Sequence, residues 1–167
     1  MKLDFTNFER LLSNICKPPA RIAVMGIGNY LRADDFLGVT IIQKLKEKIK
    51  SDSVLLLEAE IAPTDFFHTI QEWNPTHLII IDASELKAEP GTLKLIKREQ
   101  MATFTLSSHK KALTLLMDLL SVYVPNLEII IVGIQPETID YKIGLSQPIQ
   151  KTVDKLSEML VSFLSDL

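Results

Sequence analysis

Four side chains of this sequence could share a metal ion or a proton, although they lie far apart in the chain. Asp34 and Asp35 stand in "MGIGNYLRADDFLG", Asp82 follows the apolar run in "HLIIIDAS", and His109 lies in "TLSSHKKAL". Two carboxylates and one imidazole suit nickel, zinc or iron, and they leave coordination positions open for a substrate. Whether these side chains meet depends on the elements that carry them.

Continuous apolar runs predict four buried strands, because strands of a parallel sheet are covered on both faces. These strands are expected at 21–27, 53–59, 76–84 and 127–134. The segment 92–98 predicts a fifth strand of a different kind. The connection "ELKAEPG" before it is too short for a parallel crossover, which needs about a dozen residues. This strand is therefore expected to be antiparallel and at an edge, with its lysines facing water.

Apolar residues at helical spacing predict helices between the strands. They are expected from Asp34 onward, at 63–73 with Thr64 or Asp65 as the N-cap, at 110–122, and after Ser146 as the N-cap. An N-terminal helix at about 3–15 should pack its Phe5, Phe8, Leu12 and Ile15 face against the rest of the molecule, docking to a partner being the alternative. The fold class is thus α/β: a three-layer sandwich around a mostly parallel five-stranded sheet with an antiparallel edge strand.

Ligands of such sheets bind beyond the carboxyl ends of the strands. Asp34 and Asp35 follow the first strand at that end, Glu58 and Glu60 lie at the end of the second, and Asp82 ends the third. His109 precedes a helix in a loop that can reach the same edge. His77 begins the third strand, at the opposite end of the sheet, and His68 falls within a helix.

Each of these residues also has a purely structural interpretation. Asp34 and Asp35 could cap a helix, Asp82 could serve a turn, and His109 could cap a helix or be solvated. The combination of two acids and one histidine on three separate loops favours a site over these separate roles.

Three kinds of site compete for this pattern. A dinucleotide site requires G-x-G-x-x-G, but Leu31 stands where the third glycine belongs. A phosphoacceptor domain would place its acids directly after the first strand and a lysine after the last, where this sequence has "GIQPE". Glu58 and Glu60 at the end of the second strand could still contact the ribose of a dinucleotide. The third possibility is a divalent-metal site.

Composition limits the remaining function classes. The 167 residues suit a single domain spanning 1–167, and a net charge of -3 argues against nucleic acid as a partner. The apolar runs fall short of the ~20 residues that a membrane span needs, so no membrane insertion is expected. One cysteine, Cys16, and no signal-peptide pattern suit the cytoplasm.

The segments "GIGNYLRADDFLG", "HLIIIDAS", "EPGTLKLI", "SSHKKAL" and "IIIVGIQPE" occur in an order and spacing that resembles the nickel–iron hydrogenase maturation endopeptidases. The resemblance is greatest to the formate-hydrogenlyase and archaeal branch. It runs from about Arg21 to the C-terminus and leaves residues 1–20 as an N-terminal helical extension.

This resemblance implies an endopeptidase that removes the C-terminal extension of the hydrogenase large-subunit precursor once nickel has been inserted. It implies metal binding by Asp35, Asp82 and His109. We further expect that the precursor supplies the nickel and that the enzyme is a monomer. Asp35, Asp82 and Glu58 are the candidate catalytic residues, and an aspartyl-protease-like carboxylate pair is one alternative to a metal-activated water. Asp34 and Glu60 are further candidates for the base.

One departure from the family concerns the loop after the second strand. Many relatives carry an aspartate and two glycines where this sequence has "LEAEIAPTD", with Glu58 in place of the aspartate and Ala59 and Glu60 in place of the glycines. The competing function is a non-catalytic α/β module that binds a metal or a nucleotide.

Overall fold

Five strands form one sheet, and their order places the ends of β1 and β3 side by side. The computed structural model describes residues 5–104 and 107–167. The strands are β1 (Ile22–Ile27), β2 (Val54–Glu60), β3 (His77–Ala83), β4 (Leu93–Ile96) and β5 (Glu128–Ile134), in the order β2-β1-β3-β5-β4. β1, β2, β3 and β5 run parallel, and β4 pairs with β5 in the antiparallel direction at one edge. The predicted antiparallel edge strand is therefore confirmed.

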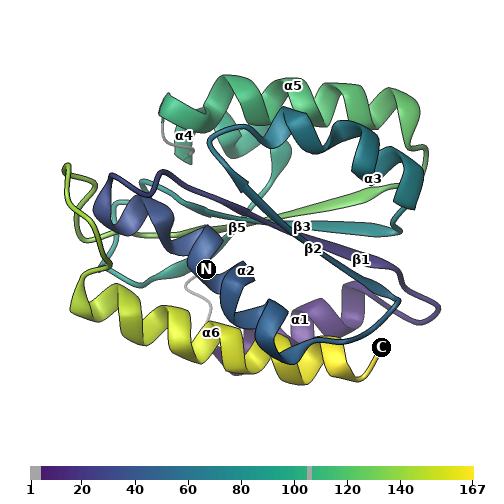
Figure 1. The fold of residues 1–167 in the computed structure, drawn as a ribbon, viewed down its shortest axis with the longest axis horizontal. Helices are drawn as coiled ribbons and strands as arrows, with labels where there is room; N and C mark the ends of the chain where they lie inside the picture. Colours follow the sequence, from purple (N-terminus) through teal and green to yellow (C-terminus); the bar gives the residue numbers. More distant parts are fainter. Residues whose placement is uncertain (1–4, 105–106) are drawn as a thin grey trace.

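Helices cover both faces of the sheet (Figure 1). α1 (Phe5–Ile15), α2 (Leu37–Lys48) and α6 (Gln147–Ser165) lie on one face, and α3 (Phe67–Trp73), α4 (Met101–Phe104) and α5 (Ser107–Tyr123) lie on the other. Alternate residues of β1 enter the two cores, Ile22 and Val24 on the α2 side and Ala23 and Met25 on the α5 side. The predicted three-layer α/β sandwich is confirmed.

The N-terminal helix packs against the body of the protein, as its apolar stripe predicts. Phe8 and Leu12 are buried, and α1 lies against α6. Phe5 and Ile15 contact the same core from partly buried positions. Residues 3 and 4 of the predicted helix lie outside the described residues. No helix in the described ranges is long and apolar enough to cross a membrane.

One predicted helix start is wrong. Neither Thr64 nor Asp65 is an N-cap, because a 3-10 turn over Pro63–Phe66 precedes α3. Ala62 takes the N-cap position of that turn without a side-chain hydrogen bond, and buried Pro63 is its first residue. Proline favours the first position of a helical turn since its φ angle is already suitable and its missing N–H is not needed there.

Close backbone contact brings α2 against the ends of β1 and β3. A Cβ atom added to Gly38, at the start of α2, would lie 2.3 Å from the carbonyl oxygen of Ile81 and 2.6 Å from that of Ile27. Only a residue without a side chain permits this approach. The 3-10 turn Ala33–Phe36 that precedes α2 is thereby held over the carboxyl end of the sheet.

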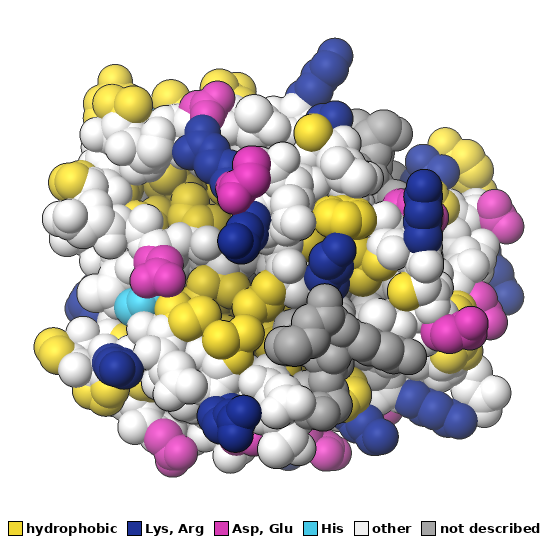
Figure 2. All heavy atoms as spheres, turned by 180° about the vertical axis from the view of Figure 1, so that it is seen from behind, with side chains coloured by type: hydrophobic (Ala, Val, Ile, Leu, Met, Phe, Trp, Pro, Cys, Tyr) yellow, Lys and Arg dark blue, Asp and Glu magenta, His cyan; other side chains and the backbone are white. Residues whose placement is uncertain are grey.

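The edge strand β4 pairs with only part of the neighbouring strand β5. The pairing of β4 with β5 extends from Ile134 to Ile131, so Glu128, Ile129 and Ile130 have no partner from β4. Figure 2, which views the molecule from behind, shows hydrophobic side chains gathered near the middle of this face, among charged ones.

Candidate active site

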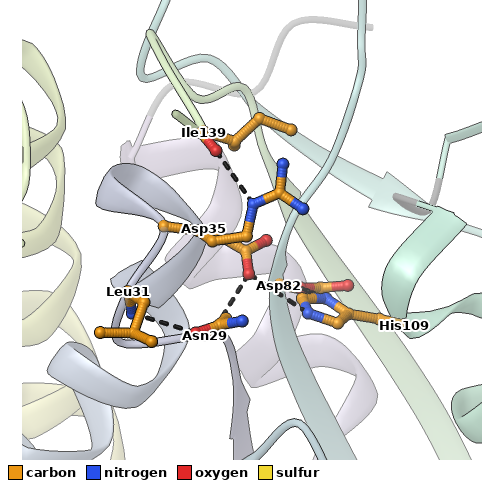
Figure 3. A network of polar contacts seen from close by, with 7 residues as sticks. Asn29, Leu31, Asp35, Asp82, His109 and Ile139 are labelled. Carbon is orange, nitrogen blue, oxygen red and sulfur yellow. Dashed lines mark hydrogen bonds and ion pairs between the residues drawn. The ribbon is translucent and has the colours of Figure 1, made fainter. Parts of the chain in front are cut away.

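Asp35, Asp82 and His109 converge in a buried cluster at the carboxyl end of the sheet (Figure 3). His109 Nε2 lies 3.3 Å from Asp35 Oδ2, and His109 Nδ1 lies 3.1 Å from Asp82 Oδ1. The three side chains are almost completely shielded from solvent, with exposed fractions of 1%, 1% and 2% for Asp35, Asp82 and His109. The structure thus brings together the three residues that the topology of the sequence had singled out.

Three different elements supply these residues. Asp35 lies in the 3-10 turn after β1, Asp82 lies near the end of β3, and His109 lies in the first turn of α5. β1 and β3 are neighbours whose register pairs Gly26 with Ile81. The chain that leaves β1 therefore meets Asp82 at the sheet edge, and α5 brings the imidazole from the opposite layer.

The imidazole of His109 is held between two carboxylates. Burial disfavours its charged form, but the hydrogen bonds and charges of Asp35 and Asp82 outweigh burial and raise the pKa of His109 to about 10. At neutral pH both ring nitrogens can therefore donate. Burial also raises the pKa of Asp82, against the stabilising effect of His109.

Two carboxylate oxygens of the cluster have no hydrogen-bond partner in the described part of the chain. These atoms, Asp35 Oδ1 and Asp82 Oδ2, are fully buried. An unsatisfied buried carboxylate oxygen is costly unless a cation or a donor reaches it. One potential ligand atom from each of Asp35, Asp82 and His109 lies within 4.8 Å of the others. The donor set and the free oxygens fit a divalent ion.

Asp34 serves a different purpose from its neighbour. Its carboxylate accepts hydrogen bonds from the backbone N–H groups of Glu137, Thr138 and Ser146 and from the Ser146 hydroxyl, at 2.7–3.1 Å. Asp34 therefore holds the β5–α6 loop against the 3-10 turn and is not available as a base. Ser146 occupies the predicted N-cap of α6, but its hydroxyl binds Asp34 rather than capping the helix.

The structure does not bring Glu58 to the cluster. The Glu58 carboxylate accepts hydrogen bonds from Lys46 at 2.7 Å and from Gln43 at 3.1 Å, both on α2. The hydrogen bond from Lys46 is the largest of the effects that lower the pKa of Glu58. Glu60 is the exposed last residue of β2, and its carbonyl oxygen accepts a hydrogen bond from the Gly28 N–H. Neither glutamate belongs to the cluster of potential ligands, and the carboxylate of Glu58 is held by α2.

His77 and His68 are not part of the cluster, and Gln135 after β5 holds a neighbouring loop in place. His77 is buried at the opposite end of the sheet, beside Thr76 and Glu128. His68 is exposed on α3. Gln135 accepts hydrogen bonds from the N–H groups of Leu86 and Ala88 and so orders the loop after β3.

Sequence reasoning missed the structural role of Asn29. Its backbone N–H donates to Asp35 Oδ2 at 2.9 Å, and its side-chain oxygen accepts from the Leu31 N–H at 3.0 Å. The second of these hydrogen bonds closes a local turn of a kind that asparagine commonly forms. This preference is the sequence signal from which the turn could have been predicted.

Comparison with known proteins relates this arrangement to a group of enzymes. A family model described as hydrogenase maturation protease matches residues 39–163, a range that includes Asp82 and His109 and begins shortly after Asp35. A putative hydrogenase maturation protease of Methanocaldococcus jannaschii is 33% identical over 168 residues, covering 95% of this chain and 96% of that protein. The hydrogenase 3 maturation protease of Escherichia coli K12 is 29% identical over 80% of this chain and 85% of that protein.

Solved structures agree with these sequence matches. The hydrogenase maturating endopeptidase HybD from E. coli superimposes with a TM-score of 0.71 at 30% identity, over 87% of this chain and 93% of that one. The HycI protease of Thermococcus kodakarensis has the same fold, with a TM-score of 0.78 at 23% identity over 93% of this chain and 99% of that one.

Fold and relatives together define an α/β endopeptidase rather than a non-catalytic binding module. More narrowly, the chain belongs to the hydrogenase maturation protease family.

Proposed function

We propose that this protein removes a C-terminal extension from the large-subunit precursor of a nickel–iron hydrogenase after nickel has been inserted. Membership of the maturation protease family supports the reaction class. The observation that carries the assignment of the site is the buried cluster of Asp35, Asp82 and His109, with its two free carboxylate oxygens.

In this proposal nickel is part of the substrate and is not a resident cofactor. The precursor's nickel docks on Asp35, Asp82 and His109, which places the nearby peptide bond against the same end of the sheet. Docking then acts as a check that the precursor is loaded, because only a metal-bearing precursor is held in position for cleavage.

Metal docking requires His109 to release a proton. Without metal, the imidazole is protonated and lies between two carboxylates. Its positive charge offsets one of their two negative charges. A metal ligand must be the neutral imidazole, so binding is accompanied by proton release and weakens as the pH falls. This competition supports the expectation that the isolated enzyme purifies with little metal.

Hydrolysis needs a water molecule and a base beside the scissile carbonyl. Asp35 and Asp82 have the unpaired oxygens that could accept the proton of that water. An aspartic-protease-like pair that shares one proton directly is less compatible with this geometry, because the His109 ring contacts both carboxylates. We therefore assign the base to one of these two aspartates, and not to Glu58.

A cleavage assay tests this proposal. Nickel-loaded and nickel-free precursor are incubated with the wild-type protein and with Asp35→Asn, and the loss of the C-terminal extension is read as a change of mass. Wild-type protein should cleave only the nickel-loaded precursor, and Asp35→Asn should cleave neither. The control Asp140→Asn changes an exposed acid of the β5–α6 loop and should cleave like wild type. Equal cleavage of both precursors would contradict the nickel check, and an active Asp35→Asn protein would contradict the site.

A further inference from the structure

The side-chain amide of Asn29 is held beside the cluster in one orientation. Asn29 directly follows the end of the β1 segment, and its backbone N–H donates to Asp35 Oδ2 at 2.9 Å. Its Oδ1 accepts a hydrogen bond from the Leu31 N–H at 3.0 Å. If the amide were turned the other way, its NH2 group would face the N–H of Leu31 and neither could accept. This contact therefore determines the position of the oxygen.

This orientation turns the amide nitrogen away from Leu31. The amide oxygen and nitrogen are separate substituents of the trigonal Cγ, so Nδ2 does not share the contact that Oδ1 makes with the Leu31 N–H. Figure 3 shows the Asn29 amide between Leu31 on one side and the Asp35–His109 pair on the other. The N–H groups of Asn29 Nδ2 therefore lie on the side of the amide that faces the Asp35–His109 pair.

The amide nitrogen is also available to a ligand. No hydrogen bond of Asn29 Nδ2 is recorded within the described ranges of the chain. It is not one of the fully buried side-chain atoms without a partner, and Asn29 as a whole is only half-buried. An oriented donor that is open to solvent can bind a substrate oxygen without first breaking a protein contact.

Peptide hydrolysis at this place requires such a donor. The oxygen of a water molecule bonds to the carbonyl carbon, one proton of that water passes to a carboxylate of the cluster, and the π electrons of C=O move onto the oxygen. When the C–N bond then breaks, the electrons return to re-form C=O and the proton goes to the leaving nitrogen. The intermediate oxyanion carries a negative charge that no group described so far stabilises directly, so an oriented N–H donor at this place lowers its free energy.

We infer that Asn29 is a catalytic residue whose Nδ2–H donates a hydrogen bond to the scissile carbonyl oxygen and stabilises the oxyanion. This inference rests on the proposed function, because the substrate is a peptide held at the cluster. The nearby Arg32 already has other partners: its Nε donates to the Ile139 carbonyl, and its guanidinium lies 5.1 Å from the centre of the Tyr141 ring.

Two variants separate donation from the turn that Asn29 forms. Asn29→Asp keeps an oxygen for the Leu31 N–H and replaces the donor with an acceptor. Asn29→Ser keeps a neutral side chain whose oxygen can accept from Leu31 but is too short to take the place of the amide nitrogen. Asn126→Asp, an exposed asparagine in the turn before β5, is the matched control for the chemical change.

Steady-state cleavage of nickel-loaded precursor by each protein is followed by mass, and kcat and KM are determined separately. Loss of one oxyanion donor lowers kcat by about 10²–10³-fold in enzymes where it has been measured. We expect a loss of this size for both Asn29 variants, with KM and melting temperature close to wild type and no change for Asn126→Asp.

The outcomes distinguish this inference from the proposed function. Wild-type kcat in Asn29→Ser would overturn the role of Asn29 while leaving the protease assignment intact. A rise in KM or a lowered melting temperature without a fall in kcat would show that Asn29 acts only through the turn, and would also overturn it. If wild-type protein cleaves no precursor, the proposed function fails, and the inference fails with it.

Discussion

At the residue scale, His109 shows how a few neighbours can set the charge of one side chain. Its ring is nearly inaccessible to water, which alone would favour the neutral form, yet carboxylates contact both ring nitrogens. The effect of these carboxylates on the pKa of His109 exceeds the effect of burial, and the pKa rises to about 10. The resting protein therefore holds a protonated imidazole between two carboxylates, and a metal ion that binds His109 must replace a ring proton.

The titration of His109 is a direct prediction. In the metal-free protein, the His109 imidazole NMR signals should not titrate near the ordinary histidine pKa of about 6.5, and should shift only as the pH approaches about 10. A midpoint for His109 at or below about 6.5 would contradict the ion cluster.

The sign of the effect on stability follows from the same shift. Because the folded-state pKa of His109 lies above its unfolded value, folding gains stability at pH values below the unfolded pKa. That stability is lost as the pH rises through about 10. His109→Gln should therefore remove most of the alkaline loss of stability seen in thermal melts of the wild-type protein at increasing pH.

At the scale of elements, neighbouring aspartates have separate duties. Asp35 faces the cluster, whereas Asp34 ties the β5–α6 loop to the turn before α2 through partners 103 to 112 residues away in the chain. The backbone adds to this connection, since the Ala33 N–H donates to the Lys142 carbonyl and the Lys142 N–H donates to Leu31. The two loops form one rim around the site.

Loss of the Asp34 charge should loosen this rim. Asp34→Asn replaces one acceptor oxygen of a buried carboxylate with an amide group, so the N–H groups of Glu137, Thr138 and Ser146 can no longer all find an acceptor there. We expect a fall of about 1–3 kcal/mol in the free energy of unfolding, which is the usual cost of leaving a buried hydrogen-bonding group without its partner. Urea unfolding measures it.

Asp140→Asn is the matched control for this measurement, because Asp140 lies in the same loop and is exposed. It should change the free energy of unfolding by no more than about 0.5 kcal/mol. Equal stability of Asp34→Asn and Asp140→Asn would show that the loop does not depend on the Asp34 carboxylate.

The elements themselves could largely be predicted from the sequence, because each depends on a short-range pattern. Apolar runs mark the parallel strands, and the short "ELKAEPG" connection requires the antiparallel edge. The start of α3 could not be predicted so well: Thr64 and Asp65 are good cap residues, but Pro63 begins a 3-10 turn one position earlier. The preference of proline for the first position of a helical turn outweighed the capping preferences of Thr64 and Asp65.

The site could be predicted in part for the same physical reason. Asp35, Asp82 and His109 meet because a parallel sheet gathers its loops at one edge. The side of the sheet that Glu58 faces depends on the register and on Lys46 and Gln43 of α2, which no local pattern reveals. The partners of Asp34 could not be found either, since they lie on a loop more than 100 residues away.

At the scale of the whole molecule, the N-terminal helix extends the core on the α2 side of the sheet. Phe8 and Leu12 are 1% and 0% exposed, and they join the core that contains residues of α6. We propose that residues 1–167 form one monomeric unit in which this helix is a structural extension.

Truncation of one buried side chain tests the role of the helix. Leu12→Ala should cost about 2–5 kcal/mol, as is usual for a buried leucine. For a protein of this size, each kcal/mol lowers the melting temperature by about 2–4 °C. Arg10→Ala, an exposed position of the same helix, is the control. If both variants melt with the wild type, α1 is not part of the stable fold and is free to dock to a partner.

The uncovered stretch of β5 has a consequence for the protein at high concentration. The first residues of β5, Glu128 to Ile130, lack a neighbour from β4. Ile129 within this stretch and Leu127 before it are only half-buried. Such an edge is a template on which a second chain can add a strand. Exposed Glu128 lies within this stretch, and the Arg98–Asp118 ion pair lies beside the hollow that Leu127 and Ile129 line. A strand that adds there would have to bury these charges, and this cost protects the molecule from aggregation.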